Sequence, residues 1–246
     1  MSKLENGRQT PTDDDIRGWT RVTGSAAETE ALLASLHTLE VQHAEWQRVL
    51  RTGLKPRQQE LIEWDQRTRL FRAFEATVVP GLLQTAEYAR ARFSEGIRRL
   101  KLPDDINDAV AARVKRQEIL YRPDKRFHFV LTEATLCFRL CSPVVMLGQL
   151  DRLVSLSQLP NVRLGVIGFG TQYATSPWHG FWLYDSQRVL IETFSASLDL
   201  RQPREIALYE SAFEQLAAVA SYGRAARGII NRAAEEMAEG VDDGDA

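Results

Sequence analysis

The stretch EATVVPGLLQTAEYARARF, from Glu75 to Phe93, organises the rest of the chain. Proline fixes φ at about −65° and glycine is free to take a positive φ, so Pro80 and Gly81 predict a tight turn after the β-branched run of residues 77–79. Apolar residues then recur at helical spacing, and Thr85 stands where an N-cap residue is expected. The stretch therefore predicts an extended segment, a turn and a helix.

The composition is that of a globular protein. The chain has 246 residues, of which 44% are hydrophobic, enough for one large core or two smaller ones. No run approaches the roughly 20 apolar residues of a membrane helix, and the first residues lack the apolar segment of a signal peptide. We therefore expect a cytoplasmic protein that does not contact a membrane.

Cysteine and histidine are too few and too dispersed to predict a metal site. Cys137 and Cys141 cannot form a disulfide framework, and we expect both to be buried free thiols. There is no Cys-x-x-Cys pair, and the four histidines lie far apart, at His37, His43, His128 and His179. The sequence predicts neither a metal nor a cofactor.

The formal net charge of −2 conceals an uneven distribution. Residues 235–246 contain six acidic residues and no basic one, which predicts a disordered acidic tail and leaves the remainder of the chain at +4 (−2 minus −6). Between Arg90 and Arg126, eleven Lys or Arg face six Asp or Glu. This second imbalance is typical of a solvated helical face; the alternative is a surface for an acidic partner or for the DNA backbone.

Residues 1–24 predict the end of one helix and the whole of another. Gly7 and Pro11 end the first helix, and Thr12 caps the second, with three aspartates in its first turn. The buried face of the second helix is expected to consist of Ile16, Trp19 and Val22, and Gly24 ends it.

Residues 25–74 predict a helical hairpin that links the two halves of the chain. A long amphipathic helix carries Leu32, Leu36, Leu39, His43, Trp46 and Leu50 at 4-3-4-3-4 spacing and ends near Gly53 and Pro56. A second helix is expected from Arg57 to about Arg72. The first helix could pack within the chain or form a coiled-coil homodimer, because three heptads do not separate the two.

Helical and alternating patterns then succeed one another. Helices are expected over 86–99, 106–121 and 144–159, strands over 127–136 and 162–169, a β-hairpin over 180–194 and closing helices over 204–237. The fold class is therefore α+β and mostly helical: a partial helix-turn-helix and a helical hairpin, followed by an α/β domain with a small mixed or antiparallel sheet. The expected divisions are 1–24, 25–74, 75–234 and 235–246.

The segment Val79-Pro-Gly-Leu-Leu-Gln-Thr-x-Glu-Tyr-Ala-Arg90 resembles the signature of the C-terminal domain in a large family of actinobacterial antitoxin-like helix-turn-helix transcriptional regulators. Further motifs of that domain follow in order: Ala112-Arg-x-x-Arg-Gln117, Phe129-x-Leu-x-Glu133, Gln149-Leu-x-x-Leu153, and the Gly180-Phe hairpin leading to Glu192. The resemblance implies a regulator whose C-terminal domain senses a ligand or binds a small partner protein encoded nearby.

The N-terminus resembles the second half of a Cro/repressor-type helix-turn-helix, with Ser2, Glu5, Gly7 and Pro11 matching in place. The resemblance implies that Ser2, Lys3, Asn6 and Arg8 lie near DNA. The first helices of such a domain would precede Ser2, so about 35 to 45 in-frame upstream residues are expected to complete it. The alternative is a protein-interaction or ligand-sensing module that no longer binds DNA.

Two further residue sets are candidates for a site. Tyr173, Trp178, His179, Trp182 and Glu192 would line a ligand or partner pocket, although ordinary aromatic packing also accounts for them. A catalytic set would consist of Glu133, His179, Asp185, Glu192 and Asp199. No Gly-x-Ser-x-Gly, P-loop or Gly-x-Gly-x-x-Gly accompanies it, so we expect no enzyme activity.

Overall fold

The computed structural model describes residues 11–33, 53–194 and 196–242, and side chains as far as residue 239. The chain forms two compact units, residues 1–47 and 48–246. The proposed DNA contacts Ser2, Lys3, Asn6 and Arg8 lie outside the described residues, as does most of the predicted amphipathic helix, including His43.

In the first unit, helix α1 (Asp13–Val22) begins as predicted at Thr12. The Thr12 side chain and the Asp15 carboxylate form a reciprocal capping box, which satisfies amide groups at the positive end of the helix. The predicted buried face is wrong, because the Trp19 and Val22 side chains are 51% and 87% exposed. Thr20 faces inward instead, with its Oγ1 2.7 Å from that of Thr29.

The second unit is built on a mixed sheet whose described strands run in the order β6-β5-β4-β1-β2-β3-β7. Three strands are parallel: β1 (Leu70–Glu75), β2 (Arg126–Thr132) and β3 (Val162–Ile167). The others are antiparallel to their neighbours: β4 (Phe181–Tyr184), β5 (Arg188–Glu192), β6 (Ser197–Leu200) and β7 (Ser221–Tyr222). This arrangement confirms the predicted α+β class with a mixed sheet.

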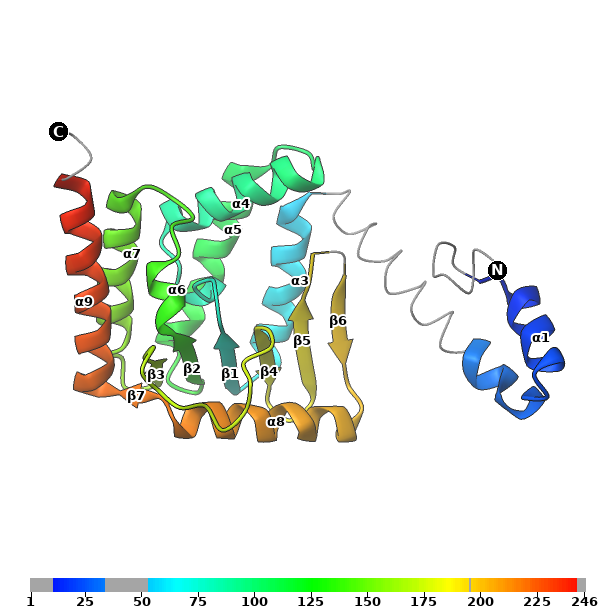
Figure 1. Ribbon diagram of the computed structural model, residues 1–246. Coiled ribbons are helices and arrows are strands. Elements are labelled where there is room, and N and C mark those ends of the chain that lie inside the picture. Colours follow the sequence, from blue (N-terminus) through cyan, green and yellow to red (C-terminus); the bar gives the residue numbers. More distant parts are fainter. Residues whose placement is uncertain (1–10, 34–52, 195, 243–246) are drawn as a thin grey trace. The chain divides into compact units, whose positions relative to one another are not determined.

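Helices surround this sheet, and α8 runs crosswise to the strands (Figure 1). The longer helices of the unit are α3 (Leu54–Arg67), α4 (Ala86–Leu100), α5 (Ile106–Arg116), α7 (Pro143–Leu156), α8 (Pro203–Ala218) and α9 (Gly223–Asp242). The short ones are η2 (Gly81–Leu83), η3 (Gln117–Tyr121) and α6 (Glu133–Cys137). Thr85 caps α4 as predicted, since its side chain accepts a hydrogen bond from the amide of Tyr88.

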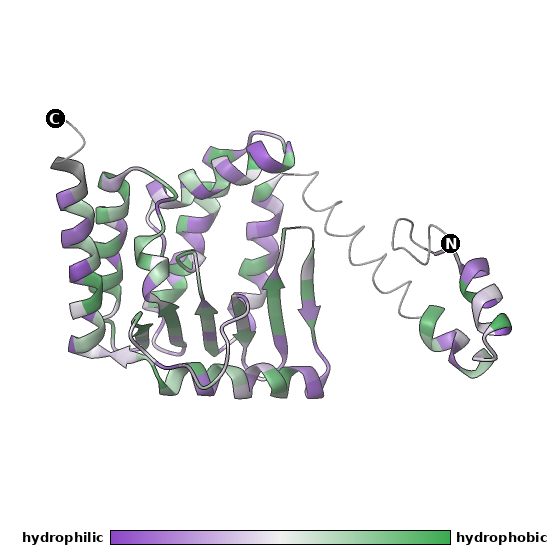
Figure 2. Cartoon of the chain, viewed as in Figure 1, coloured by the Kyte–Doolittle hydropathy of each residue, from purple (hydrophilic) through white to green (hydrophobic). Residues whose placement is uncertain are grey.

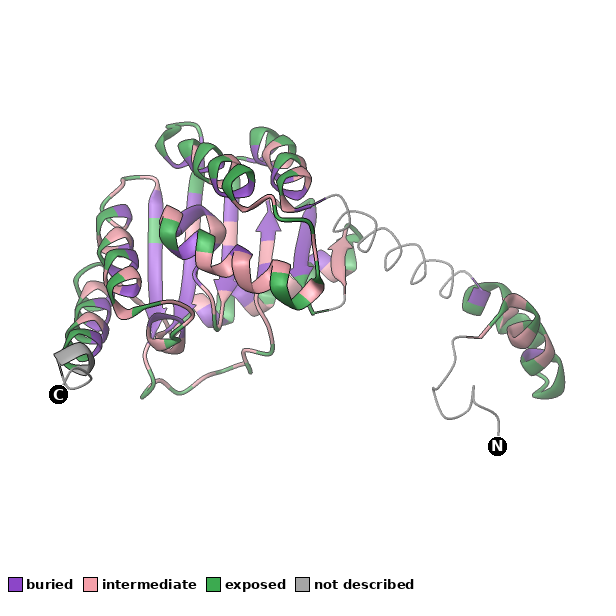
Figure 3. Cartoon of the chain, turned by 90° about the horizontal axis from the view of Figure 1, so that it is seen from above, coloured by how far each residue is buried: buried purple, intermediate pink, exposed green. Residues whose placement is uncertain are grey.

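Alternate strand residues point to two separate cores. Phe71 and Ala73 of β1 pack in the core that includes residues of α3, α4, α7 and α9, whereas Phe74 packs with Phe213 of α8. The central strands are hydrophobic and buried along most of their length, as Figures 2 and 3 show. Burial on both faces explains why β1 shows no alternating pattern in the sequence.

Several predicted boundaries are wrong. The helix expected from Arg57 to about Arg72 ends at Arg67, and its last predicted turn is part of β1. The extended run 77–79 lies outside the sheet, with Val79 buried in the first core. The strand expected over 127–136 stops at Thr132, whose side chain caps α6.

The end of the described chain also differs from expectation. Helix α9 continues to Asp242 and Met237 is 3% exposed, so helix occupies part of the segment expected to be a disordered tail. Cys137 and Cys141 are free thiols as predicted, but each is only partly buried. The division at 47/48 places α3 and β1, which were expected in the 25–74 linker, inside the second unit.

Candidate functional site

Side-chain amides from other elements hold the loop that contains Pro80 and Gly81. Gln117 Nε2 donates to the carbonyl oxygens of Gly81 and Gln84, at 2.9 and 2.8 Å. Gln149 of α7 donates to the Leu83 carbonyl at 2.9 Å and accepts from the Thr85 amide at 2.7 Å. These contacts satisfy backbone groups of the irregular loop, and three of the motifs matched in the sequence, those that contain Gly81, Gln117 and Gln149, meet here.

The role of Gly81 in the structure differs from the one predicted. It does not adopt a positive φ, which among the described glycines occurs at Gly24, Gly53 and Gly223. A Cβ at Gly81 would instead lie 3.3 Å from Cζ of Arg113. The guanidinium of Arg113 donates to the side-chain oxygens of Gln84 at 2.6 Å and Gln58 at 3.1 Å, so Gly81 leaves room for this group.

Glu75 ends β1 at the carboxyl edge of the parallel strands. Phe74 lies opposite Phe181, and extending this register by one residue places Glu75 beside Gly180. Trp182 Nε1 donates to Glu75 Oε1 at 3.1 Å. A Cβ at Gly180 would fall 2.2 Å from Glu75 Oε2, so Gly180 provides the space for the carboxyl group.

Burial raises the pKa of Glu75 to about 8, against the opposing effects of the Trp182 hydrogen bond and the Arg92 charge. The ionised form is disfavoured because the group is removed from water. Glu75 is therefore mostly protonated at pH 7, which gives the site a neutral carboxyl group that can donate a hydrogen bond.

Three guanidinium groups interact electrostatically either with Glu75 or with Glu192, whose charge also acts on Glu75. Arg57 of α3 pairs with Glu60 at 2.6 Å and with Glu192, at the end of β5, at 3.3 Å. Arg92 of α4 forms an ion pair with Glu95. Arg113 of α5 is the third, and burial together with the nearby Arg116 lowers its pKa to about 9.

We call this group the carboxyl-edge cluster: Arg57, Glu75, Arg92, Arg113, Trp182 and Glu192. Its members come from three helices and three strands, and their charges are close enough to shift one another's pKa values. The cluster lies at the carboxyl ends of the parallel strands, the edge at which open α/β sheets bind ligands.

A buried ion pair next to the cluster joins two of the helices that carry its arginines. Arg116 Nε and Nη2 contact the carboxylate of Asp65, the second at 3.3 Å, and both residues are almost fully buried. The Arg116 guanidinium also lies 5.9 Å from the centre of the Trp182 ring. The ion pair thereby joins α3 to α5, the helices that carry Arg57 and Arg113.

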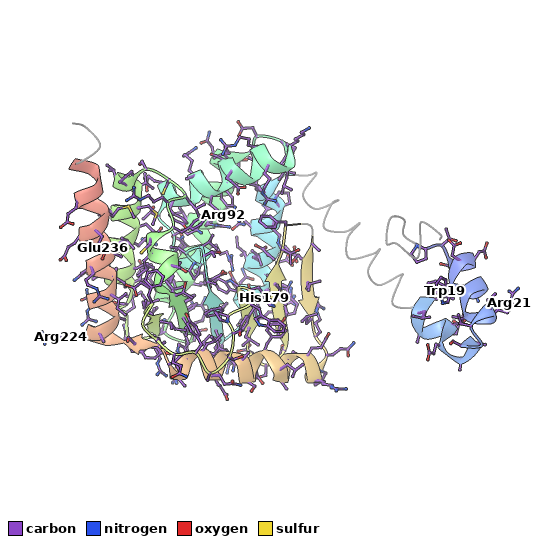
Figure 4. All side chains as sticks on the ribbon, in the orientation of Figure 1. Trp19, Arg21, Arg92, His179, Arg224 and Glu236 are labelled. Atoms are coloured by element: carbon purple, nitrogen blue, oxygen red, sulfur yellow. The ribbon has the colours of Figure 1, made fainter. Side chains whose placement is uncertain are left out.

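The residues predicted to line a pocket are divided between the two faces of the sheet. Trp182 and Glu192 belong to the carboxyl-edge cluster. His179 bonds Tyr209 of α8 at 3.2 Å, and Tyr173 packs in the α8 core. Trp178 is 88% exposed. Figure 4 labels Arg92 on α4 and His179 nearer α8.

The catalytic candidates do not converge either. Glu133 accepts the amide of Phe169 at 2.7 Å, Asp185 accepts that of Leu70 at 2.8 Å, and Asp199 pairs with Arg188 at 2.8 Å. Each carboxylate is therefore engaged in holding a different part of the fold.

Arg57, Glu75, Arg92 and Arg113 were not predicted as site residues. Arg113 stood in a motif that pointed to it, Ala112-Arg-x-x-Arg-Gln117. Glu75 carried no signal, because the first residues of the strand that ends with it, up to about Arg72, were interpreted as part of a helix.

The fold and cluster define an α+β domain with a charged site at the carboxyl edge of its mixed sheet. The profile of the domain of unknown function DUF5753 matches residues 58–232, and the chain belongs to this family. A comparison with curated proteins finds no match.

Among solved structures, the archaeal chromatin protein TrmBL2, reported to show a novel mode of DNA binding, is similar at 14% identity. The similarity covers 85% of this chain and 69% of that chain, and the TM-score of 0.33 does not establish a common fold. In the part of the chain that the structure describes, no helix combines the length and apolar character needed to cross a membrane.

Proposed function

We propose that this protein is a DNA-binding transcriptional regulator of the antitoxin-like helix-turn-helix type, in which the unit 48–246 senses a ligand. The carboxyl-edge cluster is the observation that carries the sensing role. Charged groups are costly to bury, and their removal from water is compensated only when partners satisfy them. Their concentration at the usual ligand-binding edge of an α/β sheet favours a binding function.

The regulatory role is supported by the resemblance of residues 2–11 to the end of a helix-turn-helix and by the division of the chain into two units. A regulator needs a part that contacts DNA and a part that responds to a signal. We propose Lys3 and Arg8 as phosphate contacts, which fix orientation on the duplex, with Ser2 and Asn6 nearby. The second input in this proposal is a small partner protein encoded nearby, and the protein could act as a homodimer.

We propose a binding function rather than an enzymatic one. The carboxylates that could act as acid or base are held by separate structural contacts, as described for Glu133, Asp185 and Asp199. General acid–base catalysis requires such groups to meet around one reacting atom.

The experiment is a fluorescence-anisotropy titration with DNA from the promoter region of the protein's own operon and with a scrambled duplex. It is performed on residues 1–246 and on a version extended by its in-frame upstream codons, at several salt concentrations. We expect selective, salt-dependent binding by the extended protein, weakened by Lys3→Gln combined with Arg8→Gln. Equal affinity of both versions for both duplexes would refute the regulator and leave the ligand-sensing module.

A further inference from the structure

We infer, building on the sensing role proposed above, that the carboxyl-edge cluster binds a small organic anion, whose carboxylate or phosphate group is held by Arg92 and Arg113 beside Glu75. This assigns a class of ligand and a pair of recognition residues to the site. Four features of the cluster lead to it.

The first feature is the environment of Arg113. Its hydrogen bonds go to two neutral amide oxygens, those of Gln58 and Gln84, through Nε and Nη1. Within the described residues, no Asp or Glu forms an ion pair with it. The guanidinium lies over the Phe93 ring at 4.3 Å, which fixes its plane without supplying a negative charge. Arg113 is therefore a positioned cation whose counter-ion is not provided by these contacts.

The second feature is the charge of the surrounding groups. Arg57 is matched by Glu60 and Glu192, whereas the Glu95 that pairs with Arg92 is shared with Arg99 at 2.8 Å. Glu75, the remaining acid of the cluster, is mostly protonated at pH 7. The cluster thus has an excess of positive charge, and an anion between Arg92 and Arg113 would relieve their mutual repulsion.

The third feature is the geometry of recognition. The planar guanidinium fork matches both carboxylate and phosphate groups. A protonated Glu75 carries no charge that would repel an anion. It can also donate a hydrogen bond to a hydroxyl or carbonyl oxygen of the same ligand. A ligand that presents both a charged group and a neutral polar group is a small organic anion rather than an inorganic one.

The fourth feature is access. The Glu192 side chain is 55% exposed and that of Arg92 is 35% exposed, so solvent reaches the cluster although Glu75 is largely enclosed. A ligand could therefore contact the two arginines without unfolding of the domain. The hydrogen bonds from the Gln117 and Gln149 side chains to loop 80–85, together with the Arg116–Asp65 pair, would hold the recognition groups in place before binding.

The test measures thermal unfolding and binding calorimetry of the 246-residue protein with sodium phosphate, sodium succinate or phosphoglycolate, against sodium chloride at equal ionic strength. A ligand at ten times its Kd should raise the Tm by about 3 to 6 °C. Preference for phosphate and phosphoglycolate identifies a phosphate group, and preference for succinate identifies a carboxylate. No anion-specific rise with any of the three would overturn the inference.

Matched variants assign the effect to the cluster. Arg113→Gln and Arg92→Gln should each weaken binding of the preferred anion at least tenfold, whereas Lys115→Gln on α5 and Arg98→Gln on α4, both exposed charge losses, should leave it unchanged. If Arg113→Gln does not fold, Arg92→Gln decides alone. Equal losses in the test and control variants would show that binding is a general charge effect.

The DNA titration is independent of this measurement. Anion binding without DNA binding would retain the site and reject the regulator. DNA binding without anion binding would do the reverse.

Discussion

Trp182 donates its indole N–H to the carboxyl group of Glu75, which joins the β4–β5 hairpin to the end of the central strand β1. The two residues are 107 positions apart in the chain. Because the bond favours the ionised carboxylate while burial favours the neutral acid, this contact adjusts the charge at the carboxyl edge.

The stability of the protein should therefore depend on Glu75 as the pH changes. Its pKa is about 8 in the folded state and about 4.5 when unfolded, so the folded state holds the proton more tightly. The resulting stabilisation is fully present below pH 4.5 and is lost as the pH rises through 8. It amounts to at most about 4 to 5 kcal/mol in the free energy of unfolding.

Glu75→Gln removes this titration. Urea unfolding at pH 5, 6, 7 and 8 should show the wild type losing stability relative to the variant across the series. Trp182→Phe should shift the loss to higher pH, because it removes the hydrogen bond that favours ionisation. Parallel stability curves for the wild type and Glu75→Gln would show that the Glu75 pKa is not raised.

Gly180→Ala should destabilise the second unit, because the added Cβ would fall 2.2 Å from Glu75 Oε2 and 3.3 Å from the Phe74 carbonyl oxygen. We expect a loss of about 1 to 3 kcal/mol by urea unfolding. Combining it with Glu75→Ala should recover part of the loss, since the closest clash is with that side chain.

The matched control for this change is Gly148→Ala in α7, where a Cβ meets no atom within 4 Å. It should stabilise the protein by about 0.5 to 1 kcal/mol, as replacement of a helical glycine usually does. A Gly180→Ala protein as stable as the wild type would mean that Glu75 can leave Gly180 at no cost.

Gly81→Val should destabilise the protein by more than about 1 kcal/mol through contact with Arg113 rather than through backbone strain. The distinction is testable by a double-mutant cycle with Arg113→Ala. If the guanidinium is the obstacle, Gly81→Val should cost clearly less in the Arg113→Ala background. If Gly81→Val costs the same in both backgrounds, backbone strain rather than contact with Arg113 causes the destabilisation.

Local signals in the sequence predicted the structure well where a side chain forms hydrogen bonds with backbone groups a few residues away. Thr12 and Thr85 were identified as N-caps because a capping side chain acts within three residues of itself. The mixed sheet was also anticipated, since most of its strands and helices show separate periodicities. The strand β1 was not, because Phe71 and Phe74 are both buried and remove the alternation on which strand prediction depends.

The candidate site was less predictable for a related reason. Gln58, Asp65 and Arg116 are polar residues buried inside the domain, where sequence patterns place apolar ones. Their partners come from other elements, so no local spacing reveals them. The predicted pocket set included Trp182 and Glu192 but grouped them with His179. His179 lies instead on the other face of the sheet, where it contacts Tyr209 of α8.

The last prediction concerns the buried ion pair between Asp65 of α3 and Arg116 of α5. Asp65 is 0% and Arg116 5% exposed, and Lys125 Nζ donates to the backbone oxygens of Asp65 at 2.6 Å and Thr68 at 2.7 Å. Asp65→Asn would leave a buried guanidinium without its counter-ion, and we expect a loss of about 3 to 5 kcal/mol in the free energy of unfolding. Replacing both partners by apolar residues, Asp65→Leu with Arg116→Met, should cost less than the single change. Asp124→Asn, which breaks the exposed pair of Asp124 with Arg122, serves as the control and should have no measurable effect. Urea unfolding of the four proteins decides the matter: a cost for Asp65→Asn no larger than for Asp124→Asn would mean that water reaches Arg116 and that the pair does not fix α5 against α3.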